Sequence, residues 1–340
     1  MSKSTDPSKN PPAFMPKSVK YNGALKMEVH DLSLGTMKKL VIAISGSIFA
    51  TLGTVGTAQA FQLINGQTGQ FGNGTINTWL QLDDNNTPSS IGISLSQGSL
   101  DGLPMHEQAG CLQTVPAIDN HESYECELLF PQVNANIPFT HLSINWNPHG
   151  HGPLPIFNTP HFDVHFNLLS PEKRHNITGV GDDVARVNKF PSPEFRPAGY
   201  FPPPGSAEAR MGYHWADATS PDFGTTPFQK AMIWGSYNGE MAFWEPLITL
   251  SYLQTRPNVT EALKQPAAYA KSGYYPTAYS IKYDAASQEY TVSLDGLAFR
   301  DGTTAVPEPS SVLGTLVFGA FAAGWRLKKY CSFKGLPKNK

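Results

Sequence analysis

The sequence predicts a mainly β protein, a single antiparallel β-sandwich or barrel-like domain with long Pro/Gly-rich loops and few short helices. Three observations predict this fold class. The chain of 340 residues holds 30 glycines and 29 prolines, a composition that interrupts helices and favours turns. Short segments alternate polar and apolar residues, as half-buried strands do. Aromatic residues are plentiful, at 11% of the chain, which suits short packed strands.

The expected strands follow one another along the chain, separated by clusters of turn residues. Asn238-Gly239 is the strongest of these signals, because this dipeptide favours a two-residue hairpin turn. Residues 190–205 are rich in proline and are expected to form a long surface loop. Only residues 259–265 have helical character, and Pro266 ends them. Strands are expected at 75–82, 91–95, 126–130, 141–146, 161–166, 231–237, 240–250, 279–284 and 289–294.

The N-terminal part resembles a secretory signal peptide. Met37 opens a basic segment, residues 40–52 are apolar, and Ala58-Gln59-Ala60 has the form of a small-x-small cleavage site. Residues 37–60 are therefore expected to be a signal peptide that is cleaved after Ala60. Residues 1–36 are polar and lack periodicity, which indicates a disordered leader or an over-extended reading frame. The alternative is a cytoplasmic N-terminal domain followed by an uncleaved anchor.

The C-terminal part joins Pro307-Glu308-Pro309, an uncharged apolar run at 312–325 and a basic cluster that begins at Arg326. As a helix the run would span about 21 Å, short of the ~30 Å hydrocarbon core. This order resembles the PEP-CTERM sorting signal of exported bacterial proteins, here residues 306–329, with 330–340 as a further tail. The resemblance implies that the C-terminal hydrophobic helix associates transiently with the membrane. It also implies export machinery and an exosortase-like sorting enzyme as partners. The alternative is a buried helix of a soluble domain.

The remaining residues, 61–305, are long enough for one large β domain. The net charge of −2 shows no excess of basic residues, so no nucleic-acid binding is expected. Cys111 and Cys126 are the two cysteines of this part. In an oxidising compartment they could form a disulfide that closes a loop of about 15 residues. Two reduced, buried thiols are the alternative.

Histidines gather in the centre of the domain. Nine of the ten lie between His106 and His214. If residues 161–166 form a strand, His161, Asp163 and His165 line one of its faces. Two imidazoles and a carboxylate on one face favour binding of a divalent metal, zinc or manganese. The other candidate ligands are His149, His151, His214 and Glu245.

The spacing of these residues matches no zinc-hydrolase signature. His-Glu-x-x-His does not occur, and the His-x-His pattern of cupins lacks its closely following Glu. A Ser-His-Asp catalytic triad has even less support than a metal site, because the Gly-x-Ser-x-Gly motif is absent. A network of hydrogen-bonded histidines packed against Trp146, Trp215 and Trp244 therefore remains the alternative to a metal site.

Several motifs follow one another in order over residues 70–300. They are Ile91-Gly92-Ile93 through Leu103-Pro104, Trp146-Asn147-Pro148-His149-Gly150-His151, Pro160-His161-Phe162-Asp163 with His165-Phe166, Met211-Gly212-Tyr213-His214-Trp215, and Gly235-Ser236-Tyr237 through Glu245-Pro246. Together they resemble the TTHB210-like domain, a bacterial family of unknown function. The resemblance implies a mainly β fold, an extracytoplasmic setting and a tendency to self-assemble, and hence a homo-oligomer. The leading expectation is an exported structural or binding module of the cell envelope or extracellular matrix. A metal-dependent enzyme is the competing one, and a carbohydrate-binding module is a third, based only on the aromatic content.

Overall fold

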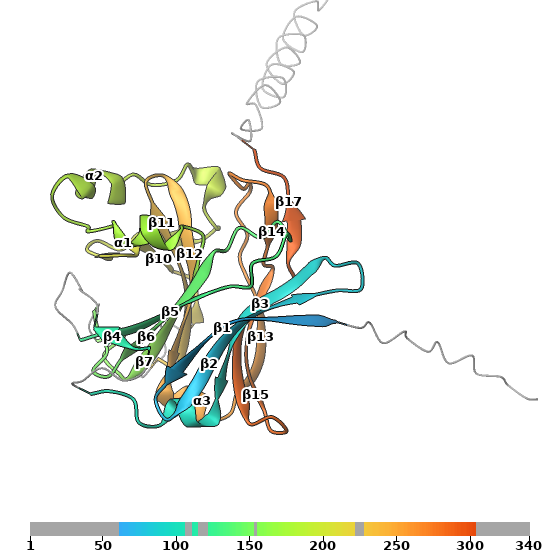
Figure 1. Cartoon of the computed structure of the whole chain (residues 1–340). Helices are drawn as coiled ribbons and strands as arrows, with labels where there is room; N and C mark the ends of the chain where they lie inside the picture. Colours follow the sequence, from blue (N-terminus) through green and yellow to red (C-terminus); the bar gives the residue numbers. More distant parts are fainter. Residues whose placement is uncertain (1–60, 106–110, 115–121, 153–154, 222–227, 304–340) are drawn as a thin grey trace, which may run out of the picture. The chain divides into compact units, whose positions relative to one another are not determined.

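The computed structural model describes residues 61–303, apart from 106–110, 115–121, 153–154 and 222–227 (Figure 1). All of them belong to one compact unit of the chain, Thr57–Lys340. The leader, the signal peptide with Ala58 and Ala60, and the sorting signal with Pro307, Glu308 and Pro309 lie outside the described residues. Within the described ranges, no helix combines the length and apolarity that a membrane crossing requires.

The fold is mainly β, and its sheets are antiparallel, as the sequence predicts. A six-stranded sheet has the order β1-β2-β3-β16-β15-β13, and a nine-stranded sheet the order β4-β5-β6-β7-β12-β11-β10-β8, with β9 paired to β10. We call these the small and the large sheet. The small sheet contains β1 (Gln62–Phe71), β2 (Gly74–Leu82), β3 (Pro88–Ser96), β13 (Asn258–Ala262), β15 (Ala278–Asp284) and β16 (Glu289–Asp295).

The large sheet is built mostly from the middle of the chain. Its central strands are β5 (Tyr124–Leu129), β6 (His141–Asn147), β7 (His161–Asn167), β10 (Gly212–Asp217), β11 (Lys230–Tyr237) and β12 (Glu240–Thr249). Short strands flank them, namely β4 (Gln113–Thr114), β8 (Tyr200–Phe201) and β9 (Ala207–Glu208). A separate pair joins β14 (Gly273–Tyr275) to β17 (Ala298–Arg300).

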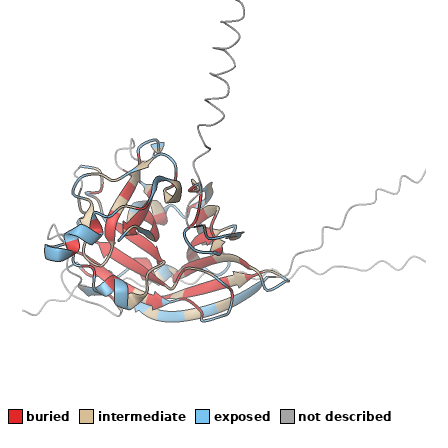
Figure 2. Ribbon diagram, turned by 90° about the horizontal axis from the view of Figure 1, so that it is seen from above, coloured by how far each residue is buried: buried red, intermediate tan, exposed pale blue. Residues whose placement is uncertain are grey.

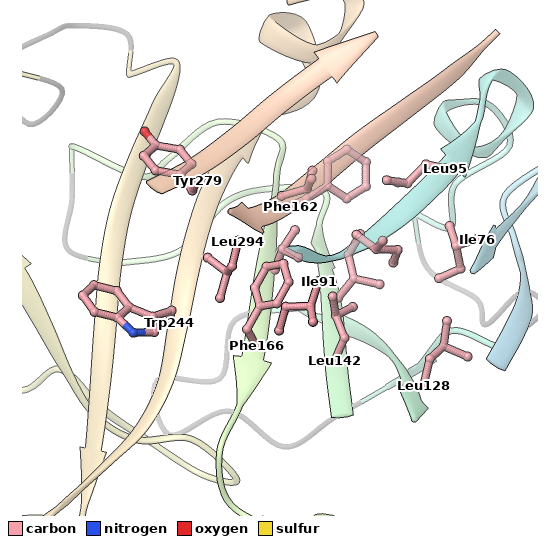
Figure 3. Packing of buried hydrophobic residues seen from close by; sticks show 14 of the residues in the cluster. Ile76, Ile91, Leu95, Leu128, Leu142, Phe162, Phe166, Trp244, Tyr279 and Leu294 are labelled. Carbon is pink, nitrogen blue, oxygen red and sulfur yellow. The ribbon is translucent and has the colours of Figure 1, made fainter. Parts of the chain in front are cut away.

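One hydrophobic core lies between the two sheets, so this part of the molecule is a β-sandwich. Ile91 and Leu95 of the small sheet meet Phe162 and Phe166 of the large sheet in a single buried cluster (Figure 3). Both phenylalanines are at most 1% exposed. Buried residues fill the central strands, whereas the edge strands β1 and β13 consist mostly of exposed and half-buried residues (Figure 2).

The opposite face of the large sheet is also buried, yet it is polar. Residues that pair across antiparallel strands share a face, so the register places the alternate residues of β5, β6 and β7 together. We call this surface the polar face. All its members but Glu127 are buried. They are Glu125, Glu127, His141, Ser143, Asn145, Asn147, His161, Asp163, His165, Asn167 and, from β12, Glu245.

Segments between the strands contain three short α-helices, α1 (Pro171–His175), α2 (Val184–Val187) and α3 (Leu250–Gln254), and three 3-10 turns, Gln97–Leu100, Gly181–Asp183 and Pro193–Phe195. Helix α3 and the first 3-10 turn pack against the main core through Leu253 and Leu100. Helix α1 and the segment around Arg210 cover the polar face instead. Arg174 of α1, 1% exposed, makes ion pairs with Glu125 and Glu127 of the polar face. Arg210 lies 2.9 Å from Glu125 through Nη2 and Oε1. These pairs fasten the covering segments onto the sheet.

The prediction of a helix at 259–265 is wrong. Asn258–Ala262 is the edge strand β13, in register with β15. Its residues alternate between exposed and half-buried, and Val259 packs against the core. The β-branched pair Val259-Thr260 fits this pleated edge better than a helix.

Three further elements differ from expectation. Gln62–Phe71 forms strand β1, ahead of the first predicted strand. The strand predicted to continue through Leu250 ends at Thr249, whose side chain accepts a hydrogen bond from the backbone N–H of Tyr252 and so caps α3. The 190–205 segment is mostly loop, as predicted, but contains a 3-10 turn and β8.

A disulfide joins Cys111 to Cys126, with the Cα atoms 5.1 Å apart. It ties the segment before β4 to the middle of β5. Gly69 of β1 lies beside it, and a Cβ at that position would meet the Cys111 sulfur at 2.9 Å. Glycine is required there because the strand passes too close for a side chain.

Candidate metal centre

The predicted ligands separate into two groups along strand β7. The first triad is His151, His161 and Asp163, and the second triad is His165, His214 and Glu245. In each triad one ligand atom from every residue lies within 4.8 Å of the others. The prediction that His161, Asp163 and His165 share a face of a strand is confirmed, since β7 spans His161–Asn167 and pairs in unbroken register with β6.

The first triad is tightly closed around Asp163. The Oδ1 atom of Asp163 lies 3.1 Å from Nε2 of His161, and its Oδ2 atom lies 3.2 Å from Nε2 of His151. The two Nε2 atoms are 2.9 Å apart. His161 is fully buried and Asp163 nearly so, while the His151 side chain is 17% exposed.

The hydrogen bonds around the first triad define which ring nitrogens face one another. Nδ1 of His161 contacts the carbonyl oxygen of Thr159 at 2.7 Å, and Nδ1 of His151 contacts that of Gly152 at 2.7 Å. A carbonyl oxygen only accepts, so both Nδ1 atoms carry the proton. In the neutral rings both Nε2 lone pairs then point toward each other, which requires a proton or a cation between them.

A second layer of contacts orients the ligands. Asn147 donates from Nδ2 to Oδ2 of Asp163 at 2.7 Å. Such outer partners fix the tautomer and direction of metal-binding groups in known metal sites. Phe157 and Phe228 flank the two imidazoles, with ring centroids 5.8 Å from His151 and 5.4 Å from His161 respectively.

The loop that carries His151 reaches the strand because of its glycine. Gly150 has a φ of +69°, and a Cβ there would meet the Phe157 carbonyl oxygen at 2.1 Å. The backbone N–H of His151 donates to the same oxygen at 2.9 Å. The loop therefore folds back on itself and directs His151 at Asp163.

The charges of the first triad stabilise one another. Burial lowers the pKa of His151, but the nearby charge of Asp163 and its hydrogen bond outweigh burial and raise the pKa to about 9. For Asp163, burial acts to raise the pKa, whereas the charges of His161 and His151 hold it well below its usual range. Without a metal, the triad therefore holds a carboxylate and a protonated imidazole.

The second triad joins three strands of the large sheet. Nε2 of His165 on β7 lies 3.3 Å from Oε1 of Glu245 on β12, and Nε2 of His214 on β10 lies 3.5 Å from Oε2 of the same carboxyl group. Nδ1 of His214 contacts the Ser206 carbonyl oxygen at 2.9 Å, so this nitrogen carries the proton. His165 is fully buried, and the Glu245 side chain is 3% exposed.

The second triad has the opposite electrostatic character. Burial, followed by the charges of Asp163 and Glu208, raises the pKa of Glu245 well above its usual range. Burial also holds the pKa of His165 well below its usual range. Burial therefore favours the neutral form of both groups when no cation is present.

His149 is the predicted ligand that belongs to neither triad. Its side chain is 54% exposed, and its Nε2 lies 3.5 Å from Oε2 of Glu122. The alternation of His149 and His151 around Gly150 does not bring both to the sheet, because the turn at Gly150 directs only His151 inward. The seven candidates thus do not converge on a single point.

Several polar-face residues were not among the predicted ligands. Asn147 holds Asp163, and His141 lies 3.6 Å from Glu127 through Nε2 and Oε2. The signal was present in the sequence, because polar residues alternate with apolar ones through 124–128 and 141–147. Reading both segments as two-faced strands would have identified the buried polar face.

Comparison with protein-family models, with curated proteins and with solved structures gave no match. The fold and the two triads define an antiparallel β-sandwich with two buried His/His/carboxylate groups on one face of its larger sheet.

Proposed function

We propose that this protein is an exported structural or binding module of the bacterial cell envelope, and that the first triad binds a divalent cation that fastens the His151 loop to the large sheet. Zinc and manganese are among the divalent cations that imidazole and carboxylate ligands bind. The export machinery, an exosortase-like sorting enzyme and further copies of the chain are the proposed partners. The C-terminal segment would hold the protein at the membrane transiently.

A single observation carries the metal proposal, the 2.9 Å approach of the His151 and His161 Nε2 atoms beside the Asp163 carboxylate. Both Nδ1 atoms are occupied by carbonyl oxygens, so both Nε2 lone pairs are presented to one point. A divalent cation there would replace the proton that His151 otherwise binds. Three ligands from a loop and a strand would then be joined through one ion.

The export proposal rests on the two terminal patterns and on the disulfide. Disulfides persist in oxidising compartments and are rare in a reducing cytoplasm. N-terminal sequencing of the exported form should begin at Phe61, and a free-thiol assay of the mature domain should detect no thiol from Cys111 or Cys126. A mature chain that begins near Met1 would contradict the proposed cleavage.

Metal analysis of protein purified without an affinity tag tests the first triad. The wild-type protein should retain zinc or manganese after dialysis, and His161→Ala should lose the ion bound at this triad. His149→Ala is the matched control, because His149 lies outside both triads and should leave the metal content unchanged. Equal metal contents of wild type and His161→Ala would contradict the proposal.

A metal-dependent enzyme is the second candidate function. The triad supplies three protein ligands, and a tetrahedral zinc ion with three protein ligands keeps a fourth position for water, as catalytic sites do. The flanking Phe157 and Phe228 and the burial of His161 favour the structural role instead.

Cobalt substitution separates the two functions. A catalytic site should bind an added anion such as azide directly to the cobalt ion and change its visible absorption spectrum. A structural site closed by the phenylalanine rings should show the same spectrum with and without azide. Phe228→Ala removes one of the two flanking rings and should let azide reach the cobalt ion. This variant therefore serves as the positive control for anion access.

A further inference from the structure

We infer that the second triad is a separate binding site for a second divalent cation, held by His165, His214 and Glu245. The inference does not depend on the first triad, because the two groups share no residue. The ion would join the outer strand β10 to the central strands β7 and β12.

Unsatisfied buried atoms carry this inference. Among the described residues, neither ring nitrogen of His165 makes a hydrogen bond, and neither does Oε2 of Glu245. Both side chains are at most 3% exposed. An unpartnered buried polar atom is costly, by about 1–3 kcal/mol, and such a group in a native protein commonly marks an ion or water that completes it.

The ligand geometry is already assembled. The contact between Nδ1 of His214 and the Ser206 carbonyl oxygen turns Nε2 of the same ring toward Glu245. The Phe243 ring packs against both imidazoles, with centroids 4.9 Å from His165 and 5.1 Å from His214, and the two imidazole centroids are 6.3 Å apart. Nε2 of His165 faces Oε1 of Glu245 and Nε2 of His214 faces Oε2, so the three side chains present ligand atoms to one point where a cation could bind.

The backbone under the second triad is adapted to this arrangement. Gly235 on β11 pairs with Phe243 on β12 and with His214 on β10. A Cβ at Gly235 would meet the Phe243 ring at 2.1 Å. The ring rests directly on the glycine, and there it packs against both His165 and His214.

The two sites lie close together but remain distinct. Asp163 and His165 are two residues apart on β7, and same-face neighbours on a strand are about 6.6 Å apart. Paired catalytic metals lie about 3.5–4 Å apart and usually share a ligand. Two separate ions, each with its own His/His/carboxylate set, are therefore expected.

Metal stoichiometry in the full-length protein tests the inference. Protein reconstituted with excess zinc or manganese and then dialysed should hold two equivalents per chain. Glu245→Gln should hold one, His161→Ala should hold one, and the double variant none. His175→Ala, an exposed histidine outside both triads, is the control and should hold two.

The outcomes separate the two proposals. One equivalent in the wild type that is lost in His161→Ala and kept in Glu245→Gln would overturn the second site and leave the first intact. One equivalent that is lost only in Glu245→Gln would overturn the first site instead. If Glu245→Gln does not fold, anomalous scattering from crystals of metal-loaded wild-type protein tests the second site instead. A peak beside His214 and Glu245 is expected. Its absence would overturn the second site.

Discussion

At the scale of single residues, Gly235 and Phe243 determine how the second triad is arranged. The absence of a side chain at Gly235 lets the Phe243 ring lie across the neighbouring strand, where it packs against both His165 and His214. Both imidazoles pack edge-on or tilted against this ring. The position of two ligands therefore depends on a residue that could not itself bind a metal.

Gly235→Ala should displace the Phe243 ring and destabilise the protein by about 1–3 kcal/mol, the usual cost of overpacking a closed interior. Urea denaturation would measure this loss. Gly235→Ala combined with Phe243→Leu should recover part of it, since the smaller side chain leaves room for the methyl group. Strictly additive effects of the two changes would show that the ring does not respond to Gly235.

His141 predicts how stability depends on pH. Burial, followed by the charges of Arg174, His175 and Arg210, lowers the pKa of His141 to about 3. The unfolded chain protonates this group near pH 6.5, so the unfolded state binds the extra proton between these values. The stabilising contribution is complete above about pH 6.5 and is lost as the pH falls toward 3, by about 1.4 kcal/mol per pH unit.

Urea midpoints between pH 7 and 5 test this expectation. The free energy of unfolding of His141→Gln should fall less steeply with decreasing pH than that of the wild type. The range above pH 5 is chosen because ordinary carboxyl groups are still mostly ionised there. Parallel pH profiles for the two proteins would contradict a neutral, buried His141.

At the scale of elements, helix α1 is held on the large sheet by one buried arginine. Ser170 caps the helix and Pro171 begins it, so its first turn forms from local sequence alone. Arg174 then reaches β5, where it pairs with Glu125 and Glu127. Glu127 also lies 2.9 Å from His175, through Oε2 and Nε2.

Arg174→Met should cost about 3–5 kcal/mol, because it leaves the buried carboxylate of Glu125 without its main counter-charge. The double variant Arg174→Met/Glu125→Leu should be more stable than Arg174→Met alone, since it removes the unpaired charge as well. Thermal denaturation of both would measure the difference. A double variant less stable than the single one would show that Glu125 is satisfied by Arg210 instead.

The sequence predicts some of these elements better than others, for physical reasons. The two faces of β7 follow from an alternation of period two, so placing His161 and Asp163 side by side needed no tertiary information. The helix predicted at 259–265 failed because short segments with mixed patterns are decided by their partner strand, here β15. The first strand, β1, gave little signal because polar residues occupy most of its length.

The candidate site was predictable only in part. His151 lies ten residues before His161, and its direction depends on the backbone turn at Gly150. His214 meets Glu245 only through the register of β10, β11 and β12, which no local pattern specifies. The sequence therefore identifies the ligand types, while strand pairing divides them into two groups.

At the scale of the whole molecule, the large sheet separates two kinds of interior. Its face toward the small sheet is apolar and holds the main core, and its other face carries charges, imidazoles and amides. Apolar burial stabilises the first interior without any ligand. The second is stabilised by ion pairs and, in the functions proposed above, by cations.

Thermal stability should accordingly depend on metal concentration. A ligand that binds only the folded state adds about 2.7 kcal/mol when its concentration is 100 times its dissociation constant. The melting temperature of the wild type should rise with added zinc or manganese and fall with a chelator. In the variant His161→Ala/Glu245→Gln it should respond to neither, and an equal response there would contradict both sites.

The buried polar face also bears on the order of folding. Collapse of apolar side chains can form the sandwich early, because that interior needs no exact placement of hydrogen bonds. The polar face loses water only when the 148–160 and 168–212 segments close over it, and those segments bring His151, Arg174 and Arg210 with them. In pulse-labelled hydrogen exchange, amides of β3 and β16 should therefore become protected before those of α1 and β10. Until that last closure the imidazoles stay in contact with solvent, so the cations proposed above could reach both triads before the ligands are buried.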